Sequence, residues 1–428
     1  MHQPLRKVSN PYWVLGLLTL VNTFGFIDRI VIQTLVQPIK IDLALSDAEL
    51  GILGGLSFAV LHALLSIPVA RLAEQRSRVV IIAIGTALWS IATSLCGATA
   101  SFAQLMLARI GVGIGEAAGV PASTSLISDY FPRSRRASAI AIFMLAVPLG
   151  AMIGGAGGGW IAQQYSWRTA FVAAGLPGIV LAILVLLTIR EPERGRFDQE
   201  AQASDTPPLK HVLRRFIEIR SLRYLVIGTT ISTTAGYGIN YFIPAYYGRR
   251  FGLDFAEAGM ISGLIGSVPG ILGIIGGGFL ADRWARRNPR VYALIPMAGF
   301  LLTAPLYLLA FTQRDWVGFS TLLAATALIQ FSYIPISAAV IQNMMHPRMR
   351  ASASAIVNLL YSLIGLGLGP LCVGALSDHF GTLDPASPAG GLQHAMMLFA
   401  LLYLLGGLFL AISSRTVRDD LERATHGG

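Results

Sequence analysis

The stretch GFLADRWARR, residues 278–287, carries four charged side chains at the junction of two long apolar runs, which lie at about 257–280 and 291–311. A helix needs about 20 apolar residues to cross a hydrocarbon core about 30 Å thick. Lipid offers no hydrogen-bond partners to exposed backbone groups, and neither run has the alternation of a barrel strand. The stretch therefore predicts a short loop between two membrane-spanning helices.

Ten further apolar runs of similar length accompany this pair. Between the sixth and seventh runs, residues 190–221 are polar and of mixed charge, and they contain EPERGRFDQE followed by two prolines. We predict an all-α membrane protein with 12 transmembrane helices: an N-terminal six-helix half (1–189), a cytoplasmic linker (190–221) and a C-terminal six-helix half with a short cytoplasmic tail (222–428). The other predicted spans lie at about 12–36, 50–70, 79–98, 102–126, 137–162, 168–189, 222–247, 316–342, 351–377 and 392–414.

The composition excludes an ordinary soluble protein. Charged residues make up 13% of the 428 residues and hydrophobic ones 54%, whereas soluble domains carry about 25% charged residues. The net charge of +10 does not indicate nucleic-acid binding, because the basic residues form short clusters between apolar runs. Cys96 and Cys372 lie inside apolar runs and are interpreted as buried hydrophobic residues. We expect no metal, no cofactor and no ATP-binding loop.

The lysines and arginines predict the orientation in the membrane. With the N-terminus inside, 25 of them fall in inside-facing connections and 5 in outside-facing ones. Because positive connections stay in the cytoplasm, both termini are predicted to be cytoplasmic. The first run is long and contains charges, so it is interpreted as a span and not as a cleaved signal. With no N-x-S/T sequon present, the pattern favours a multi-pass protein of a bacterial inner (plasma) membrane, which we expect to be a monomer.

A second charged loop, ARLAEQRSRV at 70–79, follows the second span of the first half. Repetition at half-chain distance is typical of secondary transporters. GFLADRWARR resembles the loop motif G-x-L-a-D-R-x-G-R-R of the major facilitator superfamily, whereas ARLAEQRSRV departs from that motif at its glycine, its aspartate and its first arginine. The resemblance implies the major facilitator fold and a conformational latch formed by Glu74, Arg78, Gly278, Asp282, Arg283 and Arg286.

Four ionisable residues lie inside predicted spans 1 and 4: Asp28, Arg29, Arg109 and Glu116. Each costs roughly 2.5 kcal/mol or more to place at such depth, and their formal charges cancel. At 1.5 Å per residue, Asp28 and Arg109 lie at matched depth, and Glu116 lies about 10 Å deeper than Arg109. We predict that Asp28 can pair with Arg109 if the two spans are neighbours, and that Arg29 can reach Glu116. The set is either a structural lock between helices or a site for a substrate anion or a proton.

The second half has no acidic or basic residue deep in its spans. It offers aromatic and amide side chains instead, which could line an amphipathic cavity, although outer tyrosines are equally typical of interfacial anchors. Asp378, at the outer end of span 11, is interpreted as solvated. The candidate substrate-binding residues of this half are Tyr237, Asn240, Tyr241, Tyr333 and Asn358.

Three segments resemble the Spinster family of lipid transporters within this superfamily. They are the F-x-D-R of span 1, the R-x-x-x-G-x-G-E-A of span 4 and the SDYFP at 128–132. The resemblance implies an amphipathic anionic lysolipid as substrate, of lysophospholipid or sphingosine-phosphate type. The alternatives are a proton-coupled symporter of a small organic anion, which shares the Asp-Arg of span 1 and the arginine of span 4, and a drug exporter, which the additional arginines disfavour. An enzyme is not expected, because no catalytic constellation is present.

The predicted mechanism is alternating access of the two halves around a central cavity. An anionic headgroup would bind Arg29 or Arg109, and its tail would lie against apolar helices of the second half. Asp28 or Glu116 would take up and release a proton, because a carboxylate in a transport path can change its charge. The expected partners are the lipid bilayer, the small amphipathic or anionic substrate, and protons.

Overall fold

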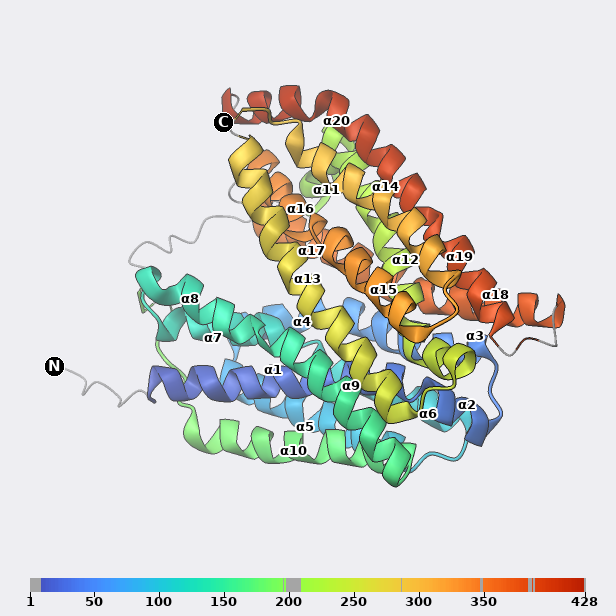
Figure 1. The fold of residues 1–428 in the computed structure, drawn as a ribbon. Helices are drawn as coiled ribbons and strands as arrows, with labels where there is room; N and C mark the ends of the chain where they lie inside the picture. The colour runs from blue at the N-terminus through green and yellow to red at the C-terminus, as the bar shows by residue number, and fades with distance from the viewer. Residues whose placement is uncertain are drawn as a thin grey trace. The chain divides into compact units, whose positions relative to one another are not determined.

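The computed structural model describes residues 9–194, 196–197, 209–285, 287–346, 349–383, 387 and 389–426. Within these residues the chain forms helices and no strand, which confirms the predicted all-α architecture (Figure 1). In the described chain, eleven helical segments are long and apolar enough to cross a membrane, and each coincides with a predicted run. They are Pro11–Thr34, Asp47–Ala73, Arg78–Cys96, Phe102–Tyr130, Ser138–Gln164, Trp167–Thr188, Phe255–Ala285, Val291–Phe311, Trp316–Met344, Ser352–Leu383 and Gly390–Arg423.

The remaining predicted span is helix α12 (Arg220–Phe251), which has 32 residues but is not among these eleven. Buried polar residues, including Thr229, Thr230, Ser232 and Thr233, dilute its apolar ones. A helix packed among other helices can carry hydroxyl side chains that hydrogen-bond to backbone carbonyls or to neighbouring helices. Its low hydropathy therefore reflects burial, and α12 completes the twelve predicted helices.

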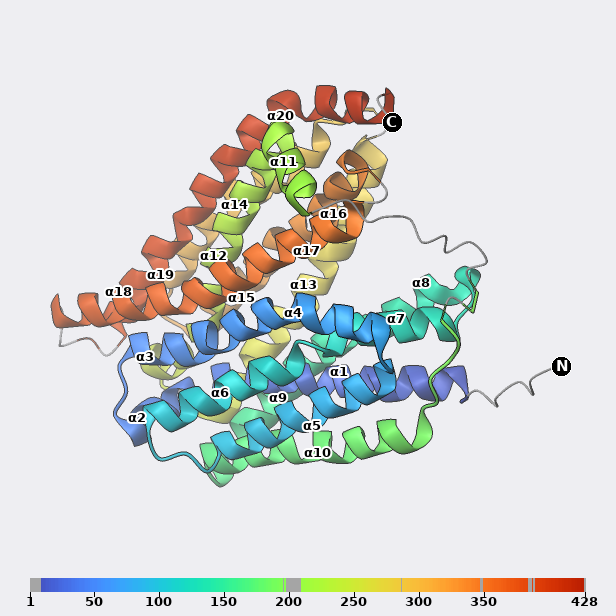
Figure 2. The ribbon, with the colours of Figure 1, turned by 180° about the vertical axis from the view of Figure 1, so that it is seen from behind.

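The chain divides into two compact units, and the first comprises Met1–Ala44, Ser57–Ser204 and Asp254–Met260. Its helices approach one another closely at glycines. Helices α5 and α10 lie side by side (Figures 1 and 2), and a Cβ added to Gly175 would come within 2.6 Å of the Ser90 carbonyl oxygen. The helices of this unit are α1 (Pro11–Thr34), α2 (Val36–Leu43), α4 (Ser57–Gln75), α5 (Arg78–Cys96), α6 (Phe102–Glu116), α7 (Gly119–Tyr130), α8 (Arg133–Met144), α9 (Ala146–Gln164) and α10 (Trp167–Thr188).

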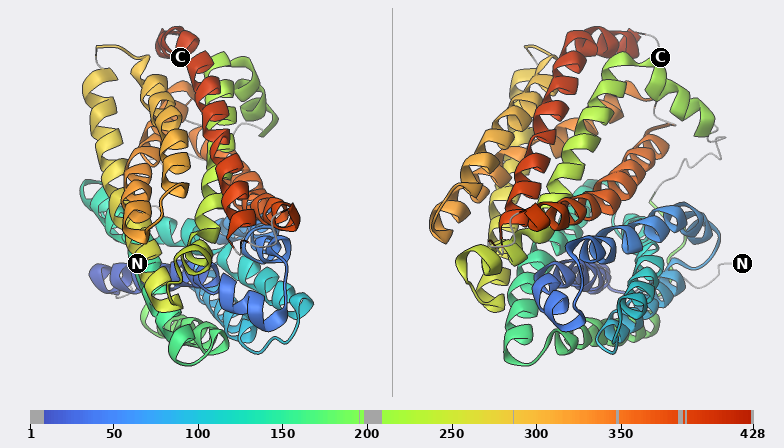
Figure 3. Two further views of the ribbon diagram at one scale, coloured as in Figure 1. Left: turned by 45° about the vertical axis from the view of Figure 1, so that its right-hand side comes forward. Right: turned by 90° about the vertical axis from the view of Figure 1, so that its right-hand side faces the viewer.

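The second unit comprises Leu45–Leu56, Asp205–Leu253 and Ile261–Gly428. Helix α12 packs along α20 (Figure 3), and Asp420 on α20 accepts hydrogen bonds from the Ser221 N–H and hydroxyl at the start of α12. Besides α12, its elements are α3 (Asp47–Gly51), the π-helical η1 (Ile52–Leu56), α11 (Leu209–Glu218), α13 (Phe255–Ala285, which begins in the first unit), α14 (Val291–Phe311), α15 (Trp316–Gln330), α16 (Tyr333–Met344), α17 (Arg350–Leu360), the π-helical η3 (Tyr361–Leu368), α18 (Gly369–Leu383), α19 (Gly390–Ala400) and α20 (Leu402–His426).

Several spans are interrupted partway along their length. In span 4, α6 ends at Glu116 and α7 begins at Gly119, while η1 interrupts span 2 immediately before α4. Irregular backbone at membrane depth is tolerated only where protein or water can satisfy it, and π-helical turns are frequent at functional sites. Glu116 is therefore placed at a helix end inside a span, where a cavity can adjoin it.

The two cysteines differ from one another. Cys96 is buried as predicted, but Cys372 on α18 is exposed, so its interpretation as a buried residue is wrong. An apolar run cannot separate the helix face that packs inside the protein from the face that meets lipid, because both are apolar.

Candidate functional site

Asp28 on α1 and Arg109 on α6 form an ion pair, as the depth estimate predicted. Arg109 Nη1 lies 3.2 Å from Asp28 Oδ2, and the two side chains are 1% and 4% exposed. The Thr93 hydroxyl on α5 donates a 2.9 Å hydrogen bond to Asp28 Oδ1. This pair is closed off from solvent, and its carboxylate has a partner for each oxygen.

Arg29 and Glu116 form the second pair, which was also predicted. The Nε of Arg29 donates to Glu116 Oε2 at 2.5 Å, and Nη2 contacts the same oxygen. Glu116 Oε1 is buried and has no hydrogen-bond partner among the described residues. The Arg29 side chain is 28% exposed, whereas that of Glu116 is 4% exposed. Only one oxygen of this carboxylate is used, and its cation is open to a ligand.

A small pocket adjoins this second pair. Arg29 and Glu116 line it together with the apolar side chains of Val21, Trp89 and Val120 and the polar ones of Asn22, Thr86 and Ser123. Gly25 also lines it, and a Cβ there would lie 3.1 Å from the Trp89 ring, so the wall between α1 and α5 is tightly packed. A guanidinium beside a carboxylate with an unused oxygen can bind an anion that carries a hydrogen-bond donor.

The five predicted binding residues of the second unit lie in different environments. Tyr237, Asn240 and Asn358 are exposed. Tyr333 is half-buried, and its hydroxyl lies 3.0 Å from the Thr233 hydroxyl. Tyr241 is buried and donates a 2.8 Å hydrogen bond to the Leu50 carbonyl, so its hydroxyl already has a partner. The three exposed side chains are the ones a ligand can reach without rearrangement.

Sequence reasoning missed a buried aromatic cluster in the same unit. Gln330 Oε1 accepts hydrogen bonds from the Tyr403 hydroxyl at 2.6 Å and from the Tyr307 hydroxyl at 3.4 Å. Tyr307 and Tyr403 stack with ring centroids 5.8 Å apart. Because the span-12 tyrosine is far from Gln330 in the chain, spacing within one helix gives no signal for the contact.

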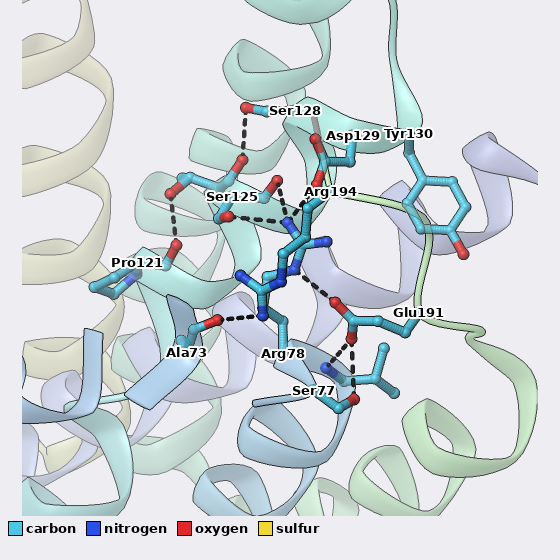
Figure 4. Close-up of polar contacts among 12 residues, drawn as sticks. Ala73, Ser77, Arg78, Pro121, Ser125, Ser128, Asp129, Tyr130, Glu191 and Arg194 are labelled. Atoms are coloured by element: carbon cyan, nitrogen blue, oxygen red, sulfur yellow. Dashed lines mark hydrogen bonds and ion pairs between the residues drawn. The ribbon is translucent and has the colours of Figure 1, made fainter. Parts of the chain in front are cut away.

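Arg78, a predicted latch residue, binds two carboxylates that the sequence did not single out as its partners. Figure 4 shows its guanidinium between Asp129 and Glu191, with Nη1 2.5 Å from Asp129 Oδ2 and Nε 2.7 Å from Glu191 Oε1. Arg78 is 2% exposed and also donates to Ser125. Asp129 belongs to the SDYFP segment and Glu191 begins EPERGRFDQE. The ion pairs therefore join α5, α7 and the segment that follows α10.

Arg194 completes this Arg78 cluster on the α4 side. Its Nη2 donates to the Ala73 carbonyl oxygen at 2.8 Å (Figure 4). The same nitrogen donates to the Arg76 carbonyl oxygen at 2.6 Å. Cations stabilise the C-terminal end of a helix by satisfying its last carbonyls. Arg194 and Arg78 therefore hold the connection between α4 and α5 from its two sides.

The other predicted latch residues show fewer contacts. The side chain of Glu74 and the whole of Arg286 lie outside the described residues. Gly278 leaves ordinary van der Waals room, with its nearest neighbour at 3.7 Å in Pro335. Asp282 and Arg283 are exposed, and no ion pair in the described part of the chain involves either. The latch role of the second loop remains a prediction.

A second buried charge cluster, within the second unit, contradicts one interpretation from the sequence. Asp378 is not simply solvated: its two carboxylate oxygens accept hydrogen bonds from the N–H groups of Asp47 and Ala48 at the start of α3. The Asp47 carboxylate in turn holds Arg249 through two 2.6 Å contacts and accepts from the Ser377 hydroxyl. A carboxylate at a helix N-terminus is stabilised by the helix dipole, which explains the position of Asp378.

The described residues contain no group of three or more His, Cys, Asp or Glu that could hold a metal ion. Charge compensation inside the spans comes from arginine instead. The site is therefore built from two arginine–carboxylate pairs and a pocket beside one of them.

Comparison with known proteins shows the family to which the chain belongs. A model of the family described as the Major Facilitator Superfamily matches residues 18–370, which is most of the chain. The chain belongs to the Major Facilitator Superfamily. This superfamily member is 35% identical to an MFS-type efflux pump of Mycolicibacterium smegmatis, over 96% of this chain and 94% of that protein. It is 26% identical to the sphingosine-1-phosphate transporter of Mus musculus, over 96% of this chain and 78% of the relative.

A solved structure of a related transporter has the same fold as this chain. The crystal structure of a bacterial homolog to the human lysosomal transporter Spinster, in an inward-facing and unoccupied conformation, matches with a TM-score of 0.88. The two sequences are 30% identical, and the match covers 96% of this chain and 98% of the other. The predicted fold and the resemblance to Spinster are both confirmed. This superfamily member is a multi-pass membrane transporter and not an enzyme.

Proposed function

We propose that this protein is a Spinster-like secondary active transporter of an amphipathic anionic lysolipid, of lysophospholipid or sphingosine-phosphate type. It works by alternating access, coupled to protons, in a bacterial inner membrane with both termini in the cytoplasm. The observation that carries this proposal is the accessible cation beside a carboxylate in the pocket. Of the four charges at membrane depth, Arg29 has the most exposed side chain, at 28%, against 4% or less for the others.

The four charges have different roles in this proposal. Arg29 binds the anionic headgroup, because its guanidinium reaches the pocket and can offer two parallel hydrogen bonds to a phosphate. Arg109 is the second candidate for binding the headgroup, and Asp28 balances its charge in the closed pair. Glu116 exchanges the proton: the uncharged acid releases Arg29 to the substrate, and the carboxylate competes with the substrate for it. Asp28 is the second candidate for that exchange.

Two of the relatives support the lipid substrate, since the mouse relative is a sphingosine-1-phosphate transporter by its name and the structural relative is a Spinster homolog. The efflux pump of Mycolicibacterium smegmatis gives no substrate in its name. Tyr237, Asn240 and Asn358 are the exposed second-unit candidates for contact with the rest of the substrate. A proton-coupled symporter of a small organic anion is the second candidate. The small pocket with polar side chains from Asn22, Thr86 and Ser123 favours it, because such a pocket suits a compact wet ligand.

The experiment that tests the proposal is thermal stabilisation of the purified protein by lysophospholipids, sphingosine phosphate and small organic acids. A ligand that binds the native state raises the melting temperature by mass action, by an amount that grows with ligand concentration over Kd. Arg29→Ala is the test variant. Arg168→Ala is the matched control, because Arg168 is an ion-paired arginine of the same unit whose side chain is 37% exposed.

The outcomes separate the two candidates. Stabilisation by lysolipids in the wild type and in Arg168→Ala, lost in Arg29→Ala, is the expected result. Stabilisation by small acids alone would replace the lipid substrate by the organic anion. Equal stabilisation of Arg29→Ala and the wild type would remove Arg29 from the binding site. In proteoliposomes, a response of transport to a pH gradient that survives unchanged in both Glu116→Gln and Asp28→Asn would refute the proton coupling.

A further inference from the structure

Phe58 lies where the two ion pairs meet, and its ring contacts the cation of each. The guanidinium carbon of Arg29 lies 5.0 Å from the ring centroid, and that of Arg109 lies 5.6 Å from it. Both distances fall within the range of about 6 Å over which a cation is attracted to the face of an aromatic ring. Phe58 is 1% exposed, so its ring is shielded from bulk solvent.

The surroundings of Phe58 hold the ring in this place. A Cβ added to Gly113 on α6 would come 2.6 Å from the Phe58 carbonyl oxygen, so α4 and α6 pack backbone to backbone at this level. The imidazole of His62, one turn along α4, stacks on the Phe58 ring with centroids 5.0 Å apart. The ring is thus fixed from its own helix and from the helix that carries Arg109.

Arg29 is held by a second ring as well. Its guanidinium carbon lies 5.1 Å from the centroid of Phe26, one turn before it on α1. Among the described residues, Arg29 therefore pairs with one carboxylate, that of Glu116, and contacts two aromatic rings. Arg109 has Asp28 and the Phe58 ring. Among the described residues, Phe58 is the aromatic side chain that contacts both cations.

We propose that Phe58 is a positioning residue of the transport site, which keeps both guanidiniums in place while the charge of Glu116 changes. When Glu116 takes up a proton or is replaced by glutamine, Arg29 loses its anionic partner. Without that partner, the half-buried guanidinium would otherwise turn toward water or draw the Asp28 carboxylate away from Arg109. The quadrupole of the ring attracts the cation without bearing a charge, so it does not compete with a substrate anion.

The contact can be tested without changing the shape of the side chain. Phenylalanine at position 58 is replaced by its 4-fluoro, 3,5-difluoro and 3,4,5-trifluoro analogues, which weaken the ring quadrupole stepwise at nearly constant volume. Phe143 is the matched control, because it is a buried phenylalanine of the same unit (1% exposed) with no cation contact in the described chain. Both series are made in the wild type and in Glu116→Gln.

Binding of sphingosine phosphate and of glycerol phosphate is measured for each variant. We expect the Kd of whichever probe binds to rise stepwise with fluorination at position 58, by about three- to tenfold over the series, and by a larger factor in Glu116→Gln. The Phe143 series should leave Kd unchanged. A role in packing alone predicts equal effects in the two series, and equal factors in the two backgrounds would overturn the link to Glu116.

This binding test rests on the proposed function, so melting temperatures of the ligand-free variants are recorded in parallel. If neither probe binds the wild type, the substrate proposal fails on its own. The inference about Phe58 then depends on the melting temperature, which should fall by about 2–4 °C with full fluorination at position 58 and stay constant for Phe143. Equal melting temperatures in the two series would refute it.

Discussion

Asp28 and Arg29 are neighbours in the sequence, yet they enter ion pairs of opposite character. Asp28 pairs with Arg109 in a closed site, where Thr93 binds its second oxygen. Arg29 pairs with Glu116 beside a pocket, and one oxygen of that carboxylate has no partner in the described chain. A closed pair with satisfied oxygens resists a change of charge, whereas an open pair with an unused oxygen permits one. Pairing alone therefore does not show which charges take part in transport.

The largest expected effect is on the closed pair. Arg109→Met leaves the Asp28 carboxylate buried without its cation, and we expect it to lower the free energy of unfolding by about 3–5 kcal/mol. Denaturant unfolding in detergent micelles measures the loss. The double variant Asp28→Asn, Arg109→Met should recover most of it, because no buried charge remains unpaired. A double variant as unstable as the single one would contradict the account of this pair.

Thr93→Val tests the third member of the closed pair at nearly constant shape. Valine removes the hydroxyl that donates to Asp28 Oδ1. Hydrogen bonds to charged groups contribute roughly 1.5–3 kcal/mol, so a loss in that range is expected in the same unfolding measurement. Ser94→Ala is the control and should cost less, because in the described chain its hydroxyl donates to a backbone carbonyl of its own helix and to no charged group. A smaller loss for Thr93→Val than for the control would mean that Asp28 does not need its third partner.

The open pair should respond differently to the same kind of change. Glu116→Gln removes one charge, but Arg29 remains partly exposed, so we expect a cost of only about 1 kcal/mol in stability. Transport in proteoliposomes should meanwhile lose its response to a pH gradient. Equal destabilisation by Glu116→Gln and Arg109→Met would contradict the distinction between an open and a closed pair.

The exposed pair of Arg168 and Asp42 is expected to have the smallest coupling energy of the three ion pairs. Arg168 and Asp42 contact each other at 2.6 Å, with side chains 37% and 44% exposed. Double-mutant cycles on exposed pairs give about 0.2–1 kcal/mol, so a cycle of Arg168→Gln and Asp42→Asn should yield a coupling energy in that range. A coupling energy above that of the Asp28–Arg109 cycle would show that burial does not order these pairs.

Much of the arrangement of the ion pairs could be predicted because a membrane helix advances by a constant rise per residue, so position in the sequence gives depth in the membrane. Counting 1.5 Å per residue from the span ends placed Asp28 and Arg109 at one depth, and the ion pair follows once α1 and α6 are close. The spans were predictable for the same reason, since lipid enforces their length and composition. Only α12 departs from the composition rule, because it is packed among other helices.

The contacts that sequence reasoning missed join segments that are not both membrane helices of predictable depth, so counting residues does not bring them together. Arg78 contacts Asp129 at the end of α7 and Glu191 after α10. Asp378 accepts a hydrogen bond at the start of α3, more than 300 residues away in the chain. Phe58 was missed for another reason. It follows the π-helical segment η1, which shifts the helical period, so the face on which Phe58 lies cannot be read from the α-helical repeat of span 2.

Glycines of span 2 and of α18 bring two pairs of elements in the second unit into backbone contact. A Cβ on Gly55 would lie 2.6 Å from the Leu366 carbonyl oxygen, and one on Gly51 or Gly374 would collide with the backbone of Pro370 or Asp47. At these points η1 meets η3 and α3 meets α18 with no side chain between them. An acyl chain cannot slide through a seam that has no room for a methyl group. In this conformation the seam is therefore closed to any ligand that approaches from the bilayer, including the proposed lysolipid.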